Sequence, residues 1–479
     1  MAFSTSGRGS YQQAEEAEGK QRAVFVYNIH IHPIPRAVYK EVVLVLWSNP
    51  VVISVSVMIV LCLFNLNIVL ALLIAAMTAG FAAGMSIPAT MGTLISGMGG
   101  NSETALAYFL LGAFAVAINR TGLATLACRK LEKIVSGKKI LLMFFIAGIA
   151  CLSGTLIPVH IAFIPILIPP LLLLFNELKA DRRQAACALA FGLKAPYITL
   201  PVGYGLIFQG IIAAEMMCNN VPLSKEMIPH FTWVLGLGMI VGLLIAVFVS
   251  YNRPRVYEDR AIVGVGTEKE EITFNATHGM TLLAVVIAFV VQLWSGSLPM
   301  GALAALIVMI LTGALKWKDV DSTFMGGLEI MGLIAFIMLI AAGYGNVLRE
   351  TKSVEQLVQN VAGMVGGSKG WGAFLMLAVG LLVTMGIGTS FGTVPVIAAI
   401  YCPLAAHLGF SAGATACLIA AAGALGDAGS PASDTTLGPT SGLNADGQHN
   451  HIWDTCVPTF IHYNIPLFIA GLIGAMYLY

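Results

Sequence analysis

The chain has 479 residues, of which 58% are hydrophobic and 10% are charged, and its formal net charge is +1. This composition excludes an ordinary soluble protein, and the near-neutral charge gives no indication of a nucleic-acid partner. A membrane-spanning helix needs roughly 20 mostly apolar residues, and the sequence contains about ten such stretches. Because these stretches are continuous rather than alternating, they favour helices over a β-barrel. We therefore predict an all-α polytopic membrane protein.

Residues 1–50 are predicted to form a polar N-terminal tail and an interfacial helix, because residues 1–40 are polar and lack the apolar core of a secretory signal. A short apolar run at 42–47 ends at Asn49-Pro50 and is expected to form an interfacial helix. The next apolar stretches predict spanning helices at 51–66, 68–83, 104–118 and, after a basic loop, 140–151.

A polar turn, Ser153-Gly154-Thr155, then separates the apolar segments 140–151 and 161–175. The helix that opens at 184–193 is expected to be interrupted over 194–205, because Pro196, Pro201 and two glycines fall within this run. A broken helix in hydrocarbon leaves backbone groups without partners, which is tolerated only where they are buried in protein or line a wet cavity. The interruption therefore indicates a functional site.

After a further span at 233–249, a hydrophilic connector at 250–277 divides the chain, and the second half repeats the features of the first. We predict one transmembrane repeat over 51–249 and a second over 278–479. The paired features recur in the same order, with offsets of 226 to 237 residues. They are Met98-Gly99-Gly100 with Met325-Gly326-Gly327, Ser153-Gly154-Thr155 with Gly388-Thr389-Ser390, Pro170-Leu171 with Pro403-Leu404, and Thr199-Leu200-Pro201 with Thr436-Leu437-Gly438-Pro439.

Each repeat is expected to contain a re-entrant hairpin with a polar tip and a broken helix, which leaves five crossings. An odd number of crossings inverts the second repeat relative to the first, as in many secondary transporters. Connections on one side of this topology carry 15 lysines and arginines, whereas those on the other carry only Lys225, Arg349, Lys352 and Lys369. The positive-inside rule places the first side, with the 250–277 connector, in the cytoplasm. The same count places the N-terminal tail outside.

The second interruption is the polar stretch 426–439, which follows a nearly pure Ala, Gly, Leu and Ile segment. At a helix break, free carbonyl groups suit a cation and free N–H groups suit a carboxylate. Asp427 and Asp434 are the expected coupling carboxylates, and Lys194 in the first break is the expected ion-pair partner of Asp427 or an alternate occupant of its site. Hydroxyl ligands are expected from both breaks and both hairpin tips. They are Ser430, Ser433, Thr435, Thr436, Thr199, Ser153, Thr155, Thr389 and Ser390.

Other polar residues favour structural roles. Glu103 and Glu329 each follow Gly-Gly near a helix start, where a carboxylate caps the helix. His160 and His407 flank the hairpins, and the pattern of His449, His451 and Asp454 is too unspecific to define a metal site. None of the eight cysteines forms a CxxC pair, so we expect them to pack in the core.

At these residues the sequence resembles the NhaC-type sodium/proton antiporter family of the ion-transporter superfamily. The segments that carry the resemblance are 426–439, Asp454-Thr455-Cys456-Val457-Pro458-Thr459 and 110–118. The family includes a branch regarded as amino-acid, in some members histidine, permeases. The resemblance implies that hairpin tips and broken helices hold sodium and substrate, that transport uses an elevator-type motion, and that many members are homodimers. Related carboxylate carriers often have Asn where this chain has Gly154, which argues against a dicarboxylate substrate.

The sequence therefore predicts a secondary active transporter rather than an enzyme, and it contains no phosphate-binding or catalytic motif in a suitable context. Sodium/proton antiport with Asp427 and Asp434 in the site is the first function. Sodium- or proton-coupled transport of an amino acid, with histidine as one candidate, is the alternative, because both need the same carboxylate and oxygen ligands. Sodium, protons and membrane lipid are the expected partners, without a further cofactor, and the bacterial inner membrane is the expected location.

Overall fold

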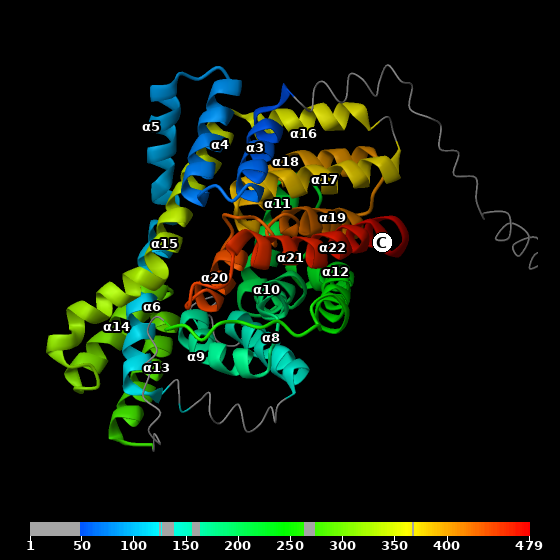
Figure 1. The fold of residues 1–479 in the computed structure, drawn as a ribbon. Helices are drawn as coiled ribbons and strands as arrows, with labels where there is room; N and C mark the ends of the chain where they lie inside the picture. The colour runs from blue at the N-terminus through cyan, green and yellow to red at the C-terminus, as the bar shows by residue number, and fades with distance from the viewer. Residues whose placement is uncertain (1–47, 124–125, 127–137, 156–162, 263–273, 366–367) are drawn as a thin grey trace, which may run out of the picture. The chain divides into compact units, whose positions relative to one another are not determined.

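The computed structural model describes residues 48–123, 126, 138–155, 163–262, 274–365 and 368–479, and within these ranges the regular secondary structure is helical (Figure 1). The tail, the interfacial helix expected at 42–47 and His160 lie outside the described residues. The chain is an integral membrane protein. Seven of the described helices are long and apolar enough to cross a membrane, or eight if one bent pair counts as a span. The five crossings per repeat stay a prediction.

The structure describes nine α-helices in the first half of the chain. They are α3 (Pro50–Leu63), α4 (Ile68–Ala82), α5 (Ile87–Met98), α6 (Ser102–Thr121), α8 (Lys139–Thr155), α9 (Ile164–Glu177), α10 (Arg182–Thr199), α11 (Tyr204–Cys218) and α12 (Ile228–Ile245). Those of the second half are α13 (Ala276–Ser295), α14 (Leu298–Leu311), α15 (Val320–Glu350), α16 (Ser353–Met364), α17 (Lys369–Ile387), α18 (Ser390–His407), α19 (Ala412–Ala424), α20 (Asp434–Leu443), α21 (Val457–Thr459) and α22 (Ile465–Ile473).

Helices α5 and α6 form one span, Ile87–Thr121, because a 3-10 turn at Gly99–Asn101 joins them without a break. The segment expected at 104–118 is therefore part of a 35-residue helix. Glu103 lies in the first turn of α6, as expected, whereas Glu329 lies inside the 31-residue helix α15. The expectation that Glu329 caps a helix start was therefore wrong, since Gly326 and Gly327 continue the helix instead of preceding its start.

Helix α15 packs along α5 and α6, and glycines set how closely it approaches α6 (Figure 1). A Cβ atom on Gly327 would lie 2.3 Å from the backbone nitrogen of Ala113, and one on Gly112 would lie 2.6 Å from the Gly327 carbonyl oxygen. Small residues at such crossings let two membrane helices gain van der Waals contact without a bulky side chain between them. The Gly-Gly pair at 326–327 thus serves packing between helices.

The order of elements in the first half recurs in the second. The hairpin α8–α9 and the broken helix α10–α11 have counterparts in α17–α18 and α19–α20. The contacts correspond as well, because α8 packs on α10 as α17 packs on α19. Each half-helix after a break contacts the hairpin of the other half, α11 with α18 and α20 with α9. The repeat boundaries and the inversion of the second repeat stay predictions.

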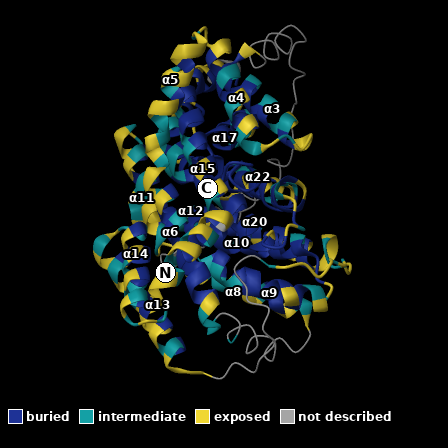
Figure 2. Cartoon of the chain, turned by 60° about the vertical axis from the view of Figure 1, so that its left-hand side comes forward, coloured by how far each residue is buried: buried dark blue, intermediate teal, exposed yellow. Residues whose placement is uncertain are grey.

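The first break is shorter than expected. Helix α10 continues through Lys194 and Pro196 to Thr199, and α11 starts at Tyr204 with a bend of 46° between the two. Placing Lys194 within the interruption was therefore wrong. A proline removes one backbone donor and crowds the preceding turn, which bends or ends many helices. Here the surrounding helices bury residues 192–198 and keep this turn helical (Figure 2).

Part of the connector packs against the start of α10. The Arg182 guanidinium lies 4.1 Å from the centre of the Tyr257 ring and forms a buried ion pair with Asp446, with a shortest N–O distance of 2.6 Å. Arg255 donates a 2.7 Å hydrogen bond to Asp454. These contacts join the connector to α10 and to the loop that follows α20.

Candidate functional site

The second break begins where α19 ends at Ala424, and its backbone requires glycine. Gly426 and Gly429 have φ angles of +84° and +103°, a region that side chains with a Cβ atom rarely adopt. A Cβ on Gly426 would also lie 2.3 Å from the Leu381 carbonyl oxygen. The chain then stays irregular until Asp434 starts α20. The interruption predicted at 426–439 is therefore present, but it is shorter than expected, because residues 434–439 belong to α20.

Buried side chains pair with the backbone groups that the break leaves open. Asn464 accepts a 3.1 Å hydrogen bond from the Gly426 N–H and donates a 2.6 Å hydrogen bond to the Ala428 carbonyl. Ser430 donates to the Met385 carbonyl at 3.2 Å. Asn464 was not among the predicted site residues, because nothing in the sequence links the segment after α21 to the break. These contacts fix the loop that carries Asp427.

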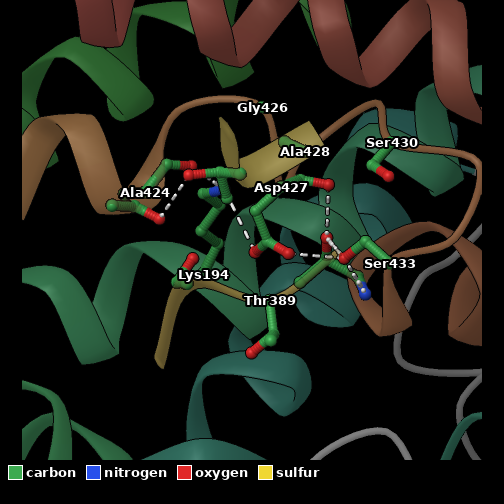
Figure 3. A network of polar contacts seen from close by, with 12 residues as sticks. Lys194, Thr389, Ala424, Gly426, Asp427, Ala428, Ser430 and Ser433 are labelled. Atoms are coloured by element: carbon green, nitrogen blue, oxygen red, sulfur yellow. Dashed lines mark hydrogen bonds and ion pairs between the residues drawn. The ribbon is translucent and has the colours of Figure 1, made fainter. Parts of the chain in front are cut away.

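Asp427 is the centre of the buried network in Figure 3, and 2% of its surface is exposed. Its Oδ1 atom accepts a 2.5 Å hydrogen bond from Ser433 Oγ. Its Oδ2 atom lies 3.1 Å from Lys194 Nζ and accepts a 3.2 Å hydrogen bond from the Tyr197 hydroxyl. An isolated buried carboxylate is costly, so pairing with a cation and hydrogen bonding make its burial possible.

Lys194 reaches this carboxylate from α10 and is fully buried. Its ammonium also donates to the carbonyl oxygen of Ala424, in the last turn of α19. The C-terminus of a helix carries partial negative charge, so the ammonium interacts favourably with both groups. The expected partnership between Lys194 and Asp427 is thus seen in the structure, although the lysine comes from intact helix.

Tyr197 is a site residue that the sequence analysis missed. It follows Lys194 by three positions and therefore lies on the same face of α10. Its hydroxyl contacts Asp427 Oδ2 and lies 2.9 Å from Ser390 Oγ at the start of α18. This spacing from Lys194 was the signal that could have identified it. The tyrosine connects the carboxylate to one of the two predicted hairpin tips.

The predicted hydroxyl ligands fall into two groups. Ser433 contacts the Asp427 side chain, and Thr435 donates a 3.2 Å hydrogen bond to the Asp427 backbone carbonyl. Thr436 instead contacts the Ser430 and Ser433 carbonyls, at 2.5 and 2.9 Å. Thr435 and Thr436 therefore donate to backbone carbonyl groups of the break and not to the Asp427 carboxylate.

The first hairpin tip and Thr199 do not join the described network. Ser153 and Thr155 donate to the carbonyls of Ala150 and Cys151 in their own helix, and Thr199 does the same with Ala195. Residues 156–162 lie outside the described part of the chain.

Thr389 at the second tip is half-buried and lies near Asp427 in Figure 3, without a drawn contact to it. Of the tip residues, only Ser390 has a hydrogen bond that leads to the carboxylate, through Tyr197.

Asp434 occupies a different position, as the first residue of α20, and it is half-buried. It lines a cavity of about 290 Å³ together with residues of α6, α11, α14 and α18. Glu103 lines the same cavity and accepts a 3.1 Å hydrogen bond from Ser297. Asp427 and Asp434 therefore belong to adjacent sites. Ser433 connects these sites, because it donates a hydrogen bond to Asp427 and directly precedes Asp434 in the chain.

The remaining polar candidates have separate partners. His451 lies 2.7 Å from Thr440 Oγ1 and 3.0 Å from the Pro431 carbonyl, whereas His449 lies 2.7 Å from Thr455 Oγ1. His407 is exposed at the end of α18. No group of three His, Cys, Asp or Glu side chains suited to a metal ion occurs in the described ranges.

Comparison with known proteins places this arrangement in a family. A model of the Na⁺/H⁺ antiporter family matches residues 188–472, more than half of the chain, and a second model of the Na⁺-H⁺ antiporter family matches 49–135. The chain belongs to the Na⁺/H⁺ antiporter family. It is a secondary transporter, and the matched regions include both breaks and the Lys194–Asp427 pair.

Two related bacterial proteins align with this chain over their whole length. An uncharacterized membrane protein of Vibrio parahaemolyticus is 48% identical over 90% of this chain and 100% of its own. The Bacillus subtilis protein YuiF, named provisionally as an amino acid transporter, is 49% identical with the same coverage. Among solved structures, the YdaH transporter of Alcanivorax borkumensis gives a TM-score of 0.42 at 14% identity, covering 81% of this chain and 87% of its own.

Proposed function

We propose that the protein exchanges sodium ions for protons across the bacterial inner membrane, with Asp427 as the coupling carboxylate. The observation that carries this proposal is the buried pair of Asp427 and Lys194 at the interrupted helix. Ionisable groups at membrane depth are costly, and they commonly belong to ion pathways. The homodimer implied by the resemblance is a further proposal for this protein.

The charges of the pair account for exchange. With Lys194 protonated and Asp427 ionised, the two side chains sum to zero. A sodium ion that binds Asp427 adds one positive charge to the same buried space. Release of one proton from Lys194 restores neutrality, so one sodium ion enters as one proton leaves. When a proton returns to Lys194, its ammonium again pairs with the Asp427 carboxylate and displaces the sodium ion.

The atoms around Lys194 suit either cation. Its ammonium contacts the Asp427 carboxylate and the carbonyl oxygen of Ala424. The hydroxyl groups of Ser433 and Tyr197 also contact this carboxylate. Carboxylate, carbonyl and hydroxyl oxygens are ligands for hard cations. Lys194 can therefore be described as a protein-bound cation that competes with sodium for Asp427.

Reconstitution into liposomes tests this function. We expect an imposed sodium gradient to change the internal pH of vesicles with the wild-type protein. Asp427→Asn should abolish this change while the purified variant keeps its monodisperse elution, because asparagine carries no charge to compensate either cation. Asp321→Asn, at an exposed position in the first turn of α15, is the matched control and should exchange at the wild-type rate. Wild-type exchange by Asp427→Asn would refute the role of Asp427.

A second function, sodium- or proton-coupled amino-acid transport, is favoured by the cavity beside Asp434. Its volume of about 290 Å³ is close to the lower end of the range of small-molecule pockets, about 300–1,000 Å³. Tyr197 connects the two sites, because its hydroxyl contacts Asp427 and its ring lies 5.4 Å from the ring of Phe391, which lines the cavity. Uptake of labelled amino acids into the same vesicles, driven by sodium or by pH, separates the two functions.

A further inference from the structure

The cavity beside Asp434 has a lining that indicates the charge of its occupant. Two carboxylates, Glu103 and Asp434, line it, and no lysine, arginine or histidine is among its lining residues in the described part of the chain. A cleft lined by one sign of charge concentrates molecules of the opposite sign. The negative lining therefore favours a positively charged solute over an anion.

Aromatic side chains form much of the remaining wall. Tyr108, Tyr204 and Phe391 come from α6, α11 and α18, and the rings of Tyr204 and Phe391 lie 6.5 Å apart in an edge-to-face arrangement. Aromatic faces attract ammonium, guanidinium and imidazolium groups because their π electrons present negative charge. A bare sodium ion is too small to contact several of these rings at once. An organic cation can contact both the aromatic rings and the carboxylates.

The start of α20 adds a group that selects against anions. Asp434 is its first residue, so a carboxylate of the protein already occupies the N-terminal turn where a solute anion would otherwise bind. Gln292 of α13, which is largely buried, also lines the cavity.

We propose that this cavity binds a small organic solute whose net charge is positive, carried by an amine, guanidine or imidazole group, and that Glu103 and Asp434 select this net positive charge. This inference rests on the second proposed function, amino-acid transport, because that function supplies the solute. It does not depend on sodium/proton exchange at Asp427. The solute site is separate from the ion pair, since neither Asp427 nor Lys194 lines the cavity.

The test compares solutes of similar size and different net charge. Binding to the purified full-length protein is measured by isothermal titration calorimetry with L-arginine, with its neutral analogue L-citrulline, with L-lysine and with L-norleucine. We expect each cationic member of a pair to bind at least tenfold more tightly than its neutral partner. Glu103→Gln should reduce this preference to less than threefold. Glu329→Gln, at an exposed position inside α15, is the matched control and should keep the full preference.

Equal binding within both pairs would overturn the proposal, as would an unchanged preference in Glu103→Gln. Absence of binding by all four solutes to protein that still exchanges sodium for protons would also overturn it and would leave the exchange function intact. Conversely, Asp427→Asn should keep the preference for the cationic solutes while losing ion coupling. Failure of the ion-coupling proposal is thus distinguishable from failure of the solute site.

Discussion

Replacing the members of the buried ion pair singly and together tests whether Lys194 and Asp427 depend on each other. Lys194→Met leaves an ionised carboxylate without its cation, and Asp427→Asn leaves an ammonium without its anion. Both side chains are at most 3% exposed, so water compensates neither charge. The double variant has no charge at this site, so it should lose less stability than the sum of the two single variants.

The structure sets the size of the effect. Two unit charges 3.1 Å apart attract each other by about 5 kcal/mol at an effective dielectric constant of about 20. Desolvation offsets part of this attraction, and removing one partner of a buried pair typically costs about 3–5 kcal/mol. We expect each single variant to lose about 3 kcal/mol or more, with a coupling energy of about 2–3 kcal/mol in the double-mutant cycle.

The measurement is the free energy of unfolding in mixed detergent micelles for the four proteins of the cycle. The exposed pair of Arg260 and Glu258 supplies the control cycle, Arg260→Met with Glu258→Gln. A surface pair of this kind typically contributes about 0.2–1 kcal/mol. If the effects of Lys194→Met and Asp427→Asn simply add, the two charges do not interact as the geometry indicates, and the exchange mechanism loses its basis.

Two further predictions concern acid stability and helix packing. Burial, opposed by nearby Asp454, lowers the pKa of His449 from 6.5 to about 3. Since the unfolded chain binds this proton first, the neutral histidine contributes its full stability above pH 6.5 and loses about 1.4 kcal/mol per pH unit below it. His449→Gln should therefore flatten the decline of the unfolding free energy between pH 6.5 and 5, and an unchanged slope would contradict this assignment. Gly327→Ala should destabilise the protein by about 1–3 kcal/mol, because its Cβ would overlap backbone atoms of α6. Gly148→Ala in α8, where a Cβ meets nothing within 4 Å, should be neutral or stabilising, and equal effects of the two on thermal unfolding would exclude the close crossing.

Local composition was enough to predict the class of the protein and where the second break begins. Continuous apolar stretches of this length are stable as membrane helices, and the glycine-rich polar run that begins at residue 426 interrupts one. Asp427 followed from the same argument, because a carboxylate in such a segment needs a cation or a donor. These conclusions depend on local composition and on the bilayer, so no knowledge of packing was necessary.

Which polar groups contact one another depends instead on how the helices pack. Lys194 lies 233 positions from Asp427 in the chain, and packing of α10 against the break brings them to 3.1 Å. Packing also kept α10 helical through Pro196, continued α5 into α6 past the glycines, and placed Asn464 on the open backbone. Asp434 and Glu103 came to line one cavity in the same way. Local propensity amounts to less than about 1 kcal/mol for most residues, so contacts between distant segments override it, and those contacts exist only in the folded protein.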